Sequence, residues 1–192
     1  EQNNILANDP MIQLLVSEMN MIDNQDIMQS KEERRKDYLI QVQAFQELIG
    51  YSIGLEDVKV VGANGNVFFS LTGIKNENFA EEPLFERGLK KAFVDFEPSG
   101  IGKKMIVVSP IFASDSKVGD EPIGVLISRM RTAAIDNIFV NRSGLGETGE
   151  VYMVNNKSLM LSESRFLEDV IFKMKVDTVG VQKCFYNGEN HL

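Results

Sequence analysis

The sequence predicts an α+β protein in which a long N-terminal helix is followed by a five-stranded antiparallel sheet. Three observations lead to this fold class. Apolar residues recur at helical spacing through the first fifty residues, five β-rich runs follow between residues 58 and 130, and an Asn-Gly pair separates the first two runs. The length of 192 residues suits one domain with an extension, or two small domains.

Two helical segments are expected at the N-terminus. Asp9 followed by Pro10 is typical of a helix start, and the apolar stripe after it consists of Ile12, Leu15, Val16, Met19 and Ile22. Ser30 and Glu33 form a capping box that opens a second segment, whose stripe consists of Tyr38, Val42, Phe45, Leu48 and Ile49. The spacing leaves open whether the two segments form one kinked helix.

The following residues change to a strand-like pattern. Runs 58–61 and 67–71 flank Asn64-Gly65, which predicts a β-hairpin. A short helix is expected over 78–91, with Pro83 near its first turn, and further strands over 93–96, 105–112 and 123–130.

A connecting helix is expected over 132–140, and a second hairpin pattern follows it. Runs 150–154 and 158–162 surround a turn at 155–157. Only about forty-five residues remain from this point, fewer than an independent sheet of four to six strands needs. The second module is therefore expected to be incomplete in this chain.

The composition excludes several classes of protein. A hydrophobic fraction of 43% and a charged fraction of 25% are those of a folded domain, and a net charge of −8 repels nucleic-acid phosphates. No apolar stretch reaches the ~18 residues of a membrane span and the first residues lack a signal-peptide pattern, so the chain as given is expected to be soluble.

The inventory of reactive side chains argues against catalysis. Cys184 is the single cysteine, and His191 is the single histidine and stands next to the last residue. Histidine-based catalysis, a disulfide and a thiolate metal cluster are thereby disfavoured, and neither a zinc nor a calcium motif is present. We therefore expect no cofactor and no metal.

Two patterns resemble functional motifs, but their sequence context favours a structural role. Gly144 to Gly149 spells G-x-G-x-x-G, but a helical segment precedes it and a β-run follows it, which is the reverse of a dinucleotide site and favours a tight turn. Glu77, Glu81, Glu82 and Glu86 are more typical of the solvated face of a short helix than of an acid pair. For Arg129, within a β-run, exposure to solvent and lining of a pocket both remain open.

The segments SGLGETGEVYMVN (143–155) and LMLSESRF (159–166) resemble the opening of the membrane-proximal module of double Cache (tandem PAS-like) sensor domains, especially those of sensor histidine kinases and diguanylate cyclases. Upstream, the Asn64-Gly65 hairpin, EPLF (82–85), VVSPI (107–111) and GVLI (124–127) are similar to the membrane-distal module. The resemblance covers nearly the whole chain.

This resemblance implies a domain organisation. Residues 1–50 would be stalk helices that pack against a partner protomer, 51–131 the membrane-distal PAS-like module, 132–143 a linker helix, and 144–192 the start of an incomplete proximal module. The full-length protein would carry flanking transmembrane helices, with this part on the extracytoplasmic side. The stripes Ile12 to Ile22 and Tyr38 to Ile49 fit a helix that forms a homodimer.

The resemblance also implies a ligand pocket in the distal module. By position, its lining would be Glu82, Phe85, Arg87, Phe93, Asp95, Ser109, Ser128 and Arg129. The amino-acid-binding version of the family has an arginine shortly before a Trp-Tyr pair and an aspartate on the last distal strand. In this sequence Glu82, Leu84 and Phe85 stand where that version has the arginine and the Trp-Tyr pair, and Arg129 stands near the position of the aspartate. Both charges are therefore reversed. A small organic acid at Arg129, or an amine or hydroxyl at Glu82, is favoured over an α-amino acid.

We therefore expect a non-catalytic, extracytoplasmic ligand-sensing domain of a transmembrane receptor, most like those of sensor histidine kinases. Two alternatives remain open from the residues alone. One is the ectodomain of a diguanylate cyclase or chemoreceptor, and the other is a protein-partner or dimerisation module without a small ligand. A one-residue shift in strand register would turn Arg129 away from the pocket.

Overall fold

A computed structural model of the chain describes residues 7–23, 55–73, 77–100, 102–140 and 144–186. The chain divides into two compact units. The first consists of Glu1–Asp95 with Met105–Met130, and the second of Phe96–Lys104 with Arg131–Leu192. The second predicted helical segment, residues 30–49, lies outside the described residues.

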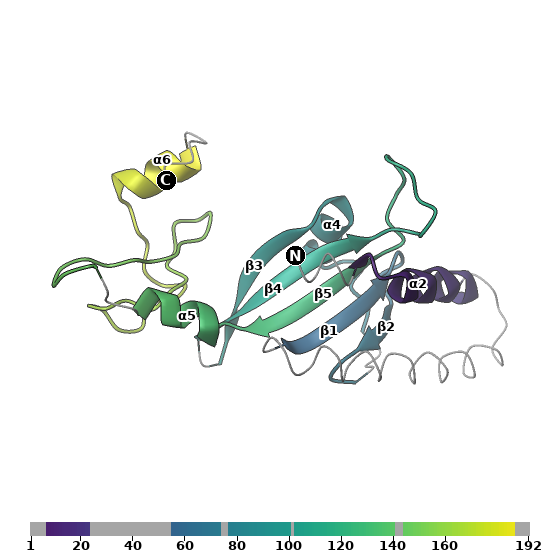
Figure 1. Ribbon diagram of the computed structural model, residues 1–192, viewed down its shortest axis with the longest axis horizontal. Helices are drawn as coiled ribbons and strands as arrows, with labels where there is room; N and C mark the ends of the chain where they lie inside the picture. The colour runs from purple at the N-terminus through teal and green to yellow at the C-terminus, as the bar shows by residue number, and fades with distance from the viewer. Residues whose placement is uncertain (1–6, 24–54, 74–76, 101, 141–143, 187–192) are drawn as a thin grey trace. The chain divides into compact units, whose positions relative to one another are not determined.

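Five strands form one sheet in the order β2-β1-β5-β4-β3 (Figure 1). Their bounds are β1 Leu55–Gly62, β2 Val67–Ser70, β3 Phe93–Ser99, β4 Gly102–Ile111 and β5 Gly124–Arg131. β1 pairs antiparallel with both β2 and β5. The predicted α+β class with a five-stranded antiparallel sheet is confirmed.

The β1–β2 hairpin turns where the Asn-Gly pair predicted it. Gly65 has a φ of +82°, which a residue without a Cβ atom adopts without strain, and the Gly62 N–H donates to the Asn66 carbonyl at 2.9 Å. The register shifts between Val60 and Val61. This bulge places the adjacent Phe68 and Phe69 in the same apolar cluster.

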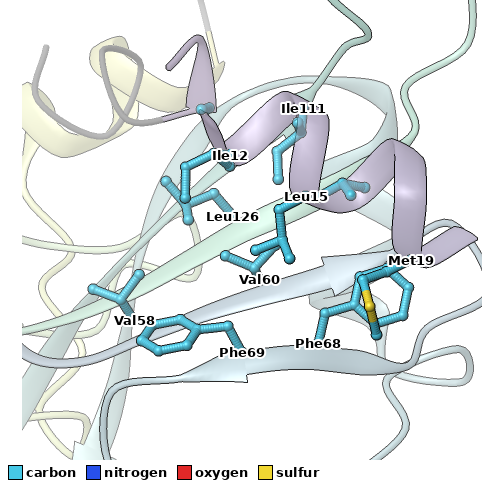
Figure 2. Close-up of a cluster of buried hydrophobic side chains, with 11 residues drawn as sticks. Ile12, Leu15, Met19, Val58, Val60, Phe68, Phe69, Ile111 and Leu126 are labelled. Carbon is cyan, nitrogen blue, oxygen red and sulfur yellow. The ribbon is translucent and has the colours of Figure 1, made fainter. Parts of the chain in front are cut away.

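Helix α2, Pro10–Asp23, covers one face of the sheet, here called the α2 face. Ile12, Leu15, Val16 and Met19 are at most 4% exposed and pack on strand residues that include Val58, Val60, Phe69, Ile111 and Leu126 (Figure 2). A helix over this first stripe is thus confirmed, whereas the long N-terminal helix stays a prediction, because residues 24–54 lie outside the described ones. The prediction that these four side chains serve a dimer contact is wrong, because their own sheet buries them.

Helix α4, Pro83–Lys90, covers the opposite face, here called the α4 face. Phe85 and Phe79 join Val61, Val67, Ile106, Val108, Val125 and Ile127 in a second buried cluster. Pro83 occupies the first turn, as its fixed φ favours. Each face of the sheet thus has its own apolar cluster.

The second unit contains helices α5, Ala133–Val140, and α6, Val179–Tyr186, and a small core of Met160, Val170, Val176 and Val181, the last of which lies on α6. The glycine-rich segment forms a turn, with Gly144 at φ +80° and Gly146 at φ +63°. Arg165 holds this turn by donating to the carbonyls of Gly149 and Gly146.

The predicted second hairpin is confirmed as a turn at 155–157 with antiparallel pairing of the two runs, but the runs do not form regular strands. Val154 and Met160 form an isolated bridge, and the Met153 N–H donates to the side-chain hydroxyl of Ser162 at 2.9 Å in place of a backbone carbonyl. Ser158, at φ 60°, bends the second run so that Met160 also pairs with residues 172 and 174. The run 158–162 therefore pairs with residues 153–155 and also with residues 172–175.

None of the helices in the described ranges has the length and apolar character that crossing a membrane requires.

Candidate functional site

The α4 face carries buried charge next to its apolar cluster. Val58 and Val60 point to the α2 face, so the alternation of side chains along β1 directs Asp57 and Lys59 to the α4 face. Ser70 on β2 lies opposite Lys59. We call Asp57, Lys59, Ser70, Thr72 and Glu77 the β1 charge cluster.

Asp57 is fixed by three neighbours. Its Oδ1 atom accepts hydrogen bonds from the Ser70 hydroxyl at 3.1 Å and from the Thr72 N–H at 3.3 Å. Its Oδ2 atom lies 3.6 Å from the Lys59 ammonium. The Asp57 side chain is 12% exposed, so its charge is balanced inside the protein.

Lys59 bridges two carboxylates. Its ammonium forms ion pairs with Asp57 and Glu77, and lies 5.8 Å from the centre of the Phe79 ring. The Lys59 side chain is 8% exposed, whereas that of Glu77 is 36% exposed. Burial of an ammonium costs several kcal/mol unless partners compensate it, so the charge is held here by its two carboxylates.

Arg129 lies on the same face as the cluster. Val125 and Ile127 belong to the apolar cluster under α4, and alternation along β5 places Arg129 with them. In the β1–β5 register Arg129 stands opposite Asp57, and it is partly buried.

Three further predicted site residues meet at the α4–β3 side of this face. The Arg87 guanidinium forms an ion pair with Asp95 at 3.0 Å, and its Cζ atom lies 4.0 Å from the centre of the Phe93 ring. The Arg87 and Asp95 side chains are about half exposed, at 53% and 46%. This group is accessible to solvent, in contrast to the buried side chains of Asp57 and Lys59.

The remaining predicted site residues are not brought together. Phe85 is buried in the apolar cluster, and Glu82 is exposed at the start of α4 without capping the helix through its side chain. Ser109 and Ser128 are buried on the α2 face, since Ser109 lies two residues before Ile111 on β4 and Ser128 stands opposite Val58. The sheet therefore separates these two serines from Arg129.

Sequence reasoning missed Asp57 and Lys59 as site candidates. The signal was present: Asp57 and Lys59 alternate with Val58 and Val60, which places both charges on one face of a strand. Such alternation ordinarily indicates a solvated face. Only the packing of residues 77–90 over that face turns it into an interior.

The second unit contains a hollow of about 440 Å³. Its lining includes the β3–β4 turn, Pro98 to Gly100, together with Glu163, Asp169, Phe172 and Lys173. Asp169 and Lys173 pair with each other and are 77% and 64% exposed. Two of the three charged side chains of this hollow are thus paired with each other and well hydrated, which makes it the weaker candidate. Across the described residues, no cluster of three or more His, Cys, Asp or Glu suits a metal ion.

Comparison with known proteins gives a fold. No protein-family model and no curated protein matches the sequence. The sensor domain of the V. cholerae histidine kinase DctB is 15% identical, with a TM-score of 0.57 over 94% of this chain and 63% of that one. The sensory domain of the Campylobacter jejuni chemoreceptor Tlp3 (CcmL), solved with isoleucine bound, is 12% identical, with a TM-score of 0.52 over 95% of this chain and 72% of that one.

The chain shares the fold of these two sensor domains. It spans 63% of the length of the DctB sensor domain. The resemblance deduced from the sequence is therefore confirmed at the level of the fold. Within this fold, the β1 charge cluster and Arg129 form the polar part of the α4 face, beside the apolar part that α4 covers.

Proposed function

We propose that this chain is the extracytoplasmic ligand-sensing part of a transmembrane signalling receptor and binds a small polar molecule on the polar part of the α4 face. The observation that carries this proposal is the buried Asp57–Lys59 pair of the β1 charge cluster, beside Arg129 in a Cache-type fold. Buried charge is costly, and it is commonly retained at sites that bind or react.

The proposal includes the receptor around this chain. A sensor histidine kinase is the favoured output, with a chemoreceptor or diguanylate cyclase as the alternative, and flanking membrane helices would carry the signal. The distal module, the linker helix and an incomplete proximal module keep the bounds 51–131, 132–143 and 144–192. Ligand binding would transmit a signal through its different affinity for two arrangements of the receptor, without any chemical reaction by this domain.

A homodimer forms part of the same proposal. The stripe of α2 is buried against its own sheet, so the stripe from Tyr38 to Ile49 is the candidate contact. Sedimentation of the purified domain, with Phe45→Asp as the disrupting variant and the wild type as reference, tests this. A monomeric wild type across the concentration range contradicts it.

A thermal-shift screen tests ligand sensing. The purified domain is heated with organic acids, amines, amino acids and nucleobases, and a ligand at 100 times its Kd adds about 2.7 kcal/mol, or about 5 to 10 °C for a chain of this size. Arg129→Ala should abolish the shift and leave the ligand-free fold intact. Arg131→Ala, an exposed arginine on the same strand, is the matched control. An unchanged shift in Arg129→Ala contradicts the assignment of the site.

A second candidate function is contact with another protein. It is favoured by large apolar side chains exposed in the second unit, among them Phe166 at 54%, Leu167 at 49% and Val179 at 68%. Replacing Phe166 and Leu167 by serine should weaken association through this surface, measured by sedimentation against the wild type, and should leave the ligand-induced thermal shift unchanged.

A further inference from the structure

We propose that Glu77 is a built-in competitor that occupies the Lys59 ammonium in the ligand-free protein, and that the ligand of this site is a small carboxylate that takes its place. This inference rests on the proposed ligand-sensing function. It adds the chemical class of the ligand, the residue that receives it and the residue that it must displace.

The two carboxylates on Lys59 are held very differently. Asp57 is anchored by the Ser70 hydroxyl and the Thr72 N–H, and its side chain is 12% exposed. The Glu77 side chain is 36% exposed, and among the described residues Lys59 is the polar side chain that it contacts. Asp57 is therefore a fixed partner of Lys59, whereas Glu77 is a partner that solvent reaches.

The backbone at Glu77 positions its carboxylate at the rim of the cluster. The Glu77 carbonyl accepts a hydrogen bond from the Val67 N–H at 3.3 Å, and two residues later the Phe79 N–H donates to the Gly65 carbonyl at 2.7 Å. The main chain can thus stay attached to the β1–β2 hairpin while the Glu77 side chain changes rotamer. Displacement of Glu77 needs only side-chain rotation.

Exchange of one carboxylate for another avoids the main cost of binding at a buried charge. Lys59 is already desolvated, so an incoming carboxylate replaces the Glu77 charge without exposing or burying a new ammonium. An amine would meet Lys59 as a like charge, and a neutral amide would leave the ammonium with a weaker partner. The geometry thus selects a carboxylate.

A tethered competitor lowers the apparent affinity for the ligand. If Lys59 is free of Glu77 in about a tenth of the molecules, the apparent Kd is about ten times the intrinsic value. Removal of the Glu77 charge should therefore tighten binding by about tenfold or more. A side chain with a purely structural role would give the opposite result, since its loss would loosen the site.

Calorimetric titration of the purified chain with acetate and propionate tests this, with acetamide and propionamide as neutral probes of the same shape. Glu77→Gln should bind the two acids about tenfold more tightly than the wild type and should not bind the amides. Glu86→Gln is the matched control, because it removes one carboxylate that pairs with a lysine, Lys90, on an exposed surface. It should leave the affinity unchanged.

Removal of the Lys59 ammonium, the group that receives the ligand, completes the test. Lys59→Met should abolish binding of the acids, and the double variant Lys59→Met/Glu77→Gln, which leaves one fewer unpaired carboxylate, should also fail to bind while keeping a cooperative unfolding transition. An affinity in Glu77→Gln that equals or falls below that of the wild type overturns the proposal, as does retained binding in the double variant. Failure of every acid in both the wild type and Glu77→Gln also overturns it, and a thermal-shift hit of other chemistry then leaves the proposed sensing function standing.

Discussion

Gly88 on α4 and Val108 on β4 lie so close that a Cβ atom at position 88 would be 2.6 Å from the Val108 Cγ1 atom. The Cγ1 atom of Val125 on β5 would be 2.8 Å away. α4 therefore approaches the sheet directly over β4 and β5. Arg129 stands two inward-facing positions beyond Val125 on β5, so the helix seals the apolar part of the α4 face and Arg129 lies further along the strand.

Gly88→Ala should destabilise the first unit. The added methyl group must displace α4 from two core valines, an overpacking that typically costs about 1–3 kcal/mol, against a gain of up to about 1 kcal/mol in helix propensity. We expect a net loss of about 1–2 kcal/mol in urea unfolding. Gly180→Ala in α6 is the control, because its nearest neighbour is the Thr178 hydroxyl at 3.9 Å. Equal stabilisation of both variants would contradict close packing at Gly88.

Asp136→Asn, in the second unit, should lower the free energy of unfolding more than Gly88→Ala does. The Lys103 side chain is 1% exposed and its ammonium pairs with Asp136, whose Oδ2 atom also accepts the Thr132 hydroxyl at 2.6 Å. Removal of the charge leaves a buried ammonium without its counter-ion, which costs about 3–5 kcal/mol. Both losses are measured by urea unfolding, and Lys103→Met/Asp136→Leu should recover most of the loss of Asp136→Asn, because neither charge is then left buried without a partner. A loss below about 1 kcal/mol in Asp136→Asn would show that the pair is solvated.

Arg165→Lys should loosen the glycine-rich turn without unfolding the second unit. Arg165 donates through two guanidinium nitrogens to the carbonyls of Gly149 and Gly146, and a lysine cannot reproduce this planar fork. Hydrogen exchange should become faster at residues 144–150, where the Gly149 N–H donates to Leu145. Lys183→Arg, on the exposed surface of α6, should leave the exchange of this segment unchanged. If these amides exchange as slowly in Arg165→Lys as in the wild type, the turn is stabilised by its own backbone hydrogen bonds and not by Arg165.

The elements that local patterns predicted are those whose packing follows from one segment. The stripe Ile12 to Met19 became α2 because a 3, 4, 7 spacing suits any flat apolar surface, and the Asn64-Gly65 pair turned the hairpin because its backbone preference is local. Strand lengths were underestimated: β3 runs to Ser99 and β4 begins at Gly102, because the hairpin continues past the β-rich residues.

The candidate site was harder to predict because it depends on which face of each strand is covered. The sequence around Lys59 has the pattern of a strand with one solvated face. Lys59 is buried because Phe79 and Glu77, about twenty residues later, pack against it. Ser109 and Ser128 were placed in the pocket by position along the chain, and alternation sends both to the α2 face. Arg87, Phe93 and Asp95 were predicted together and do meet, since a short helix and the next strand are neighbours in sequence.

The Glu86–Lys90 pair on α4 predicts a measurable titration shift. The hydrogen bond from Lys90, at 2.6 Å, and then its positive charge lower the pKa of Glu86 from the ordinary value of 4.5. Because the folded protein holds this proton less tightly than the unfolded chain, the stabilisation is present above about pH 4.5 and is lost as the pH falls through the folded pKa. Both side chains are 71% exposed, so the effect on stability should be small. In an NMR titration of the side-chain carboxyl, Lys90→Ala should raise the Glu86 midpoint toward 4.5. Lys91→Ala, which removes a neighbouring charge but not the hydrogen bond, should leave the midpoint nearly unchanged, and equal shifts in the two variants would assign the effect to long-range charge.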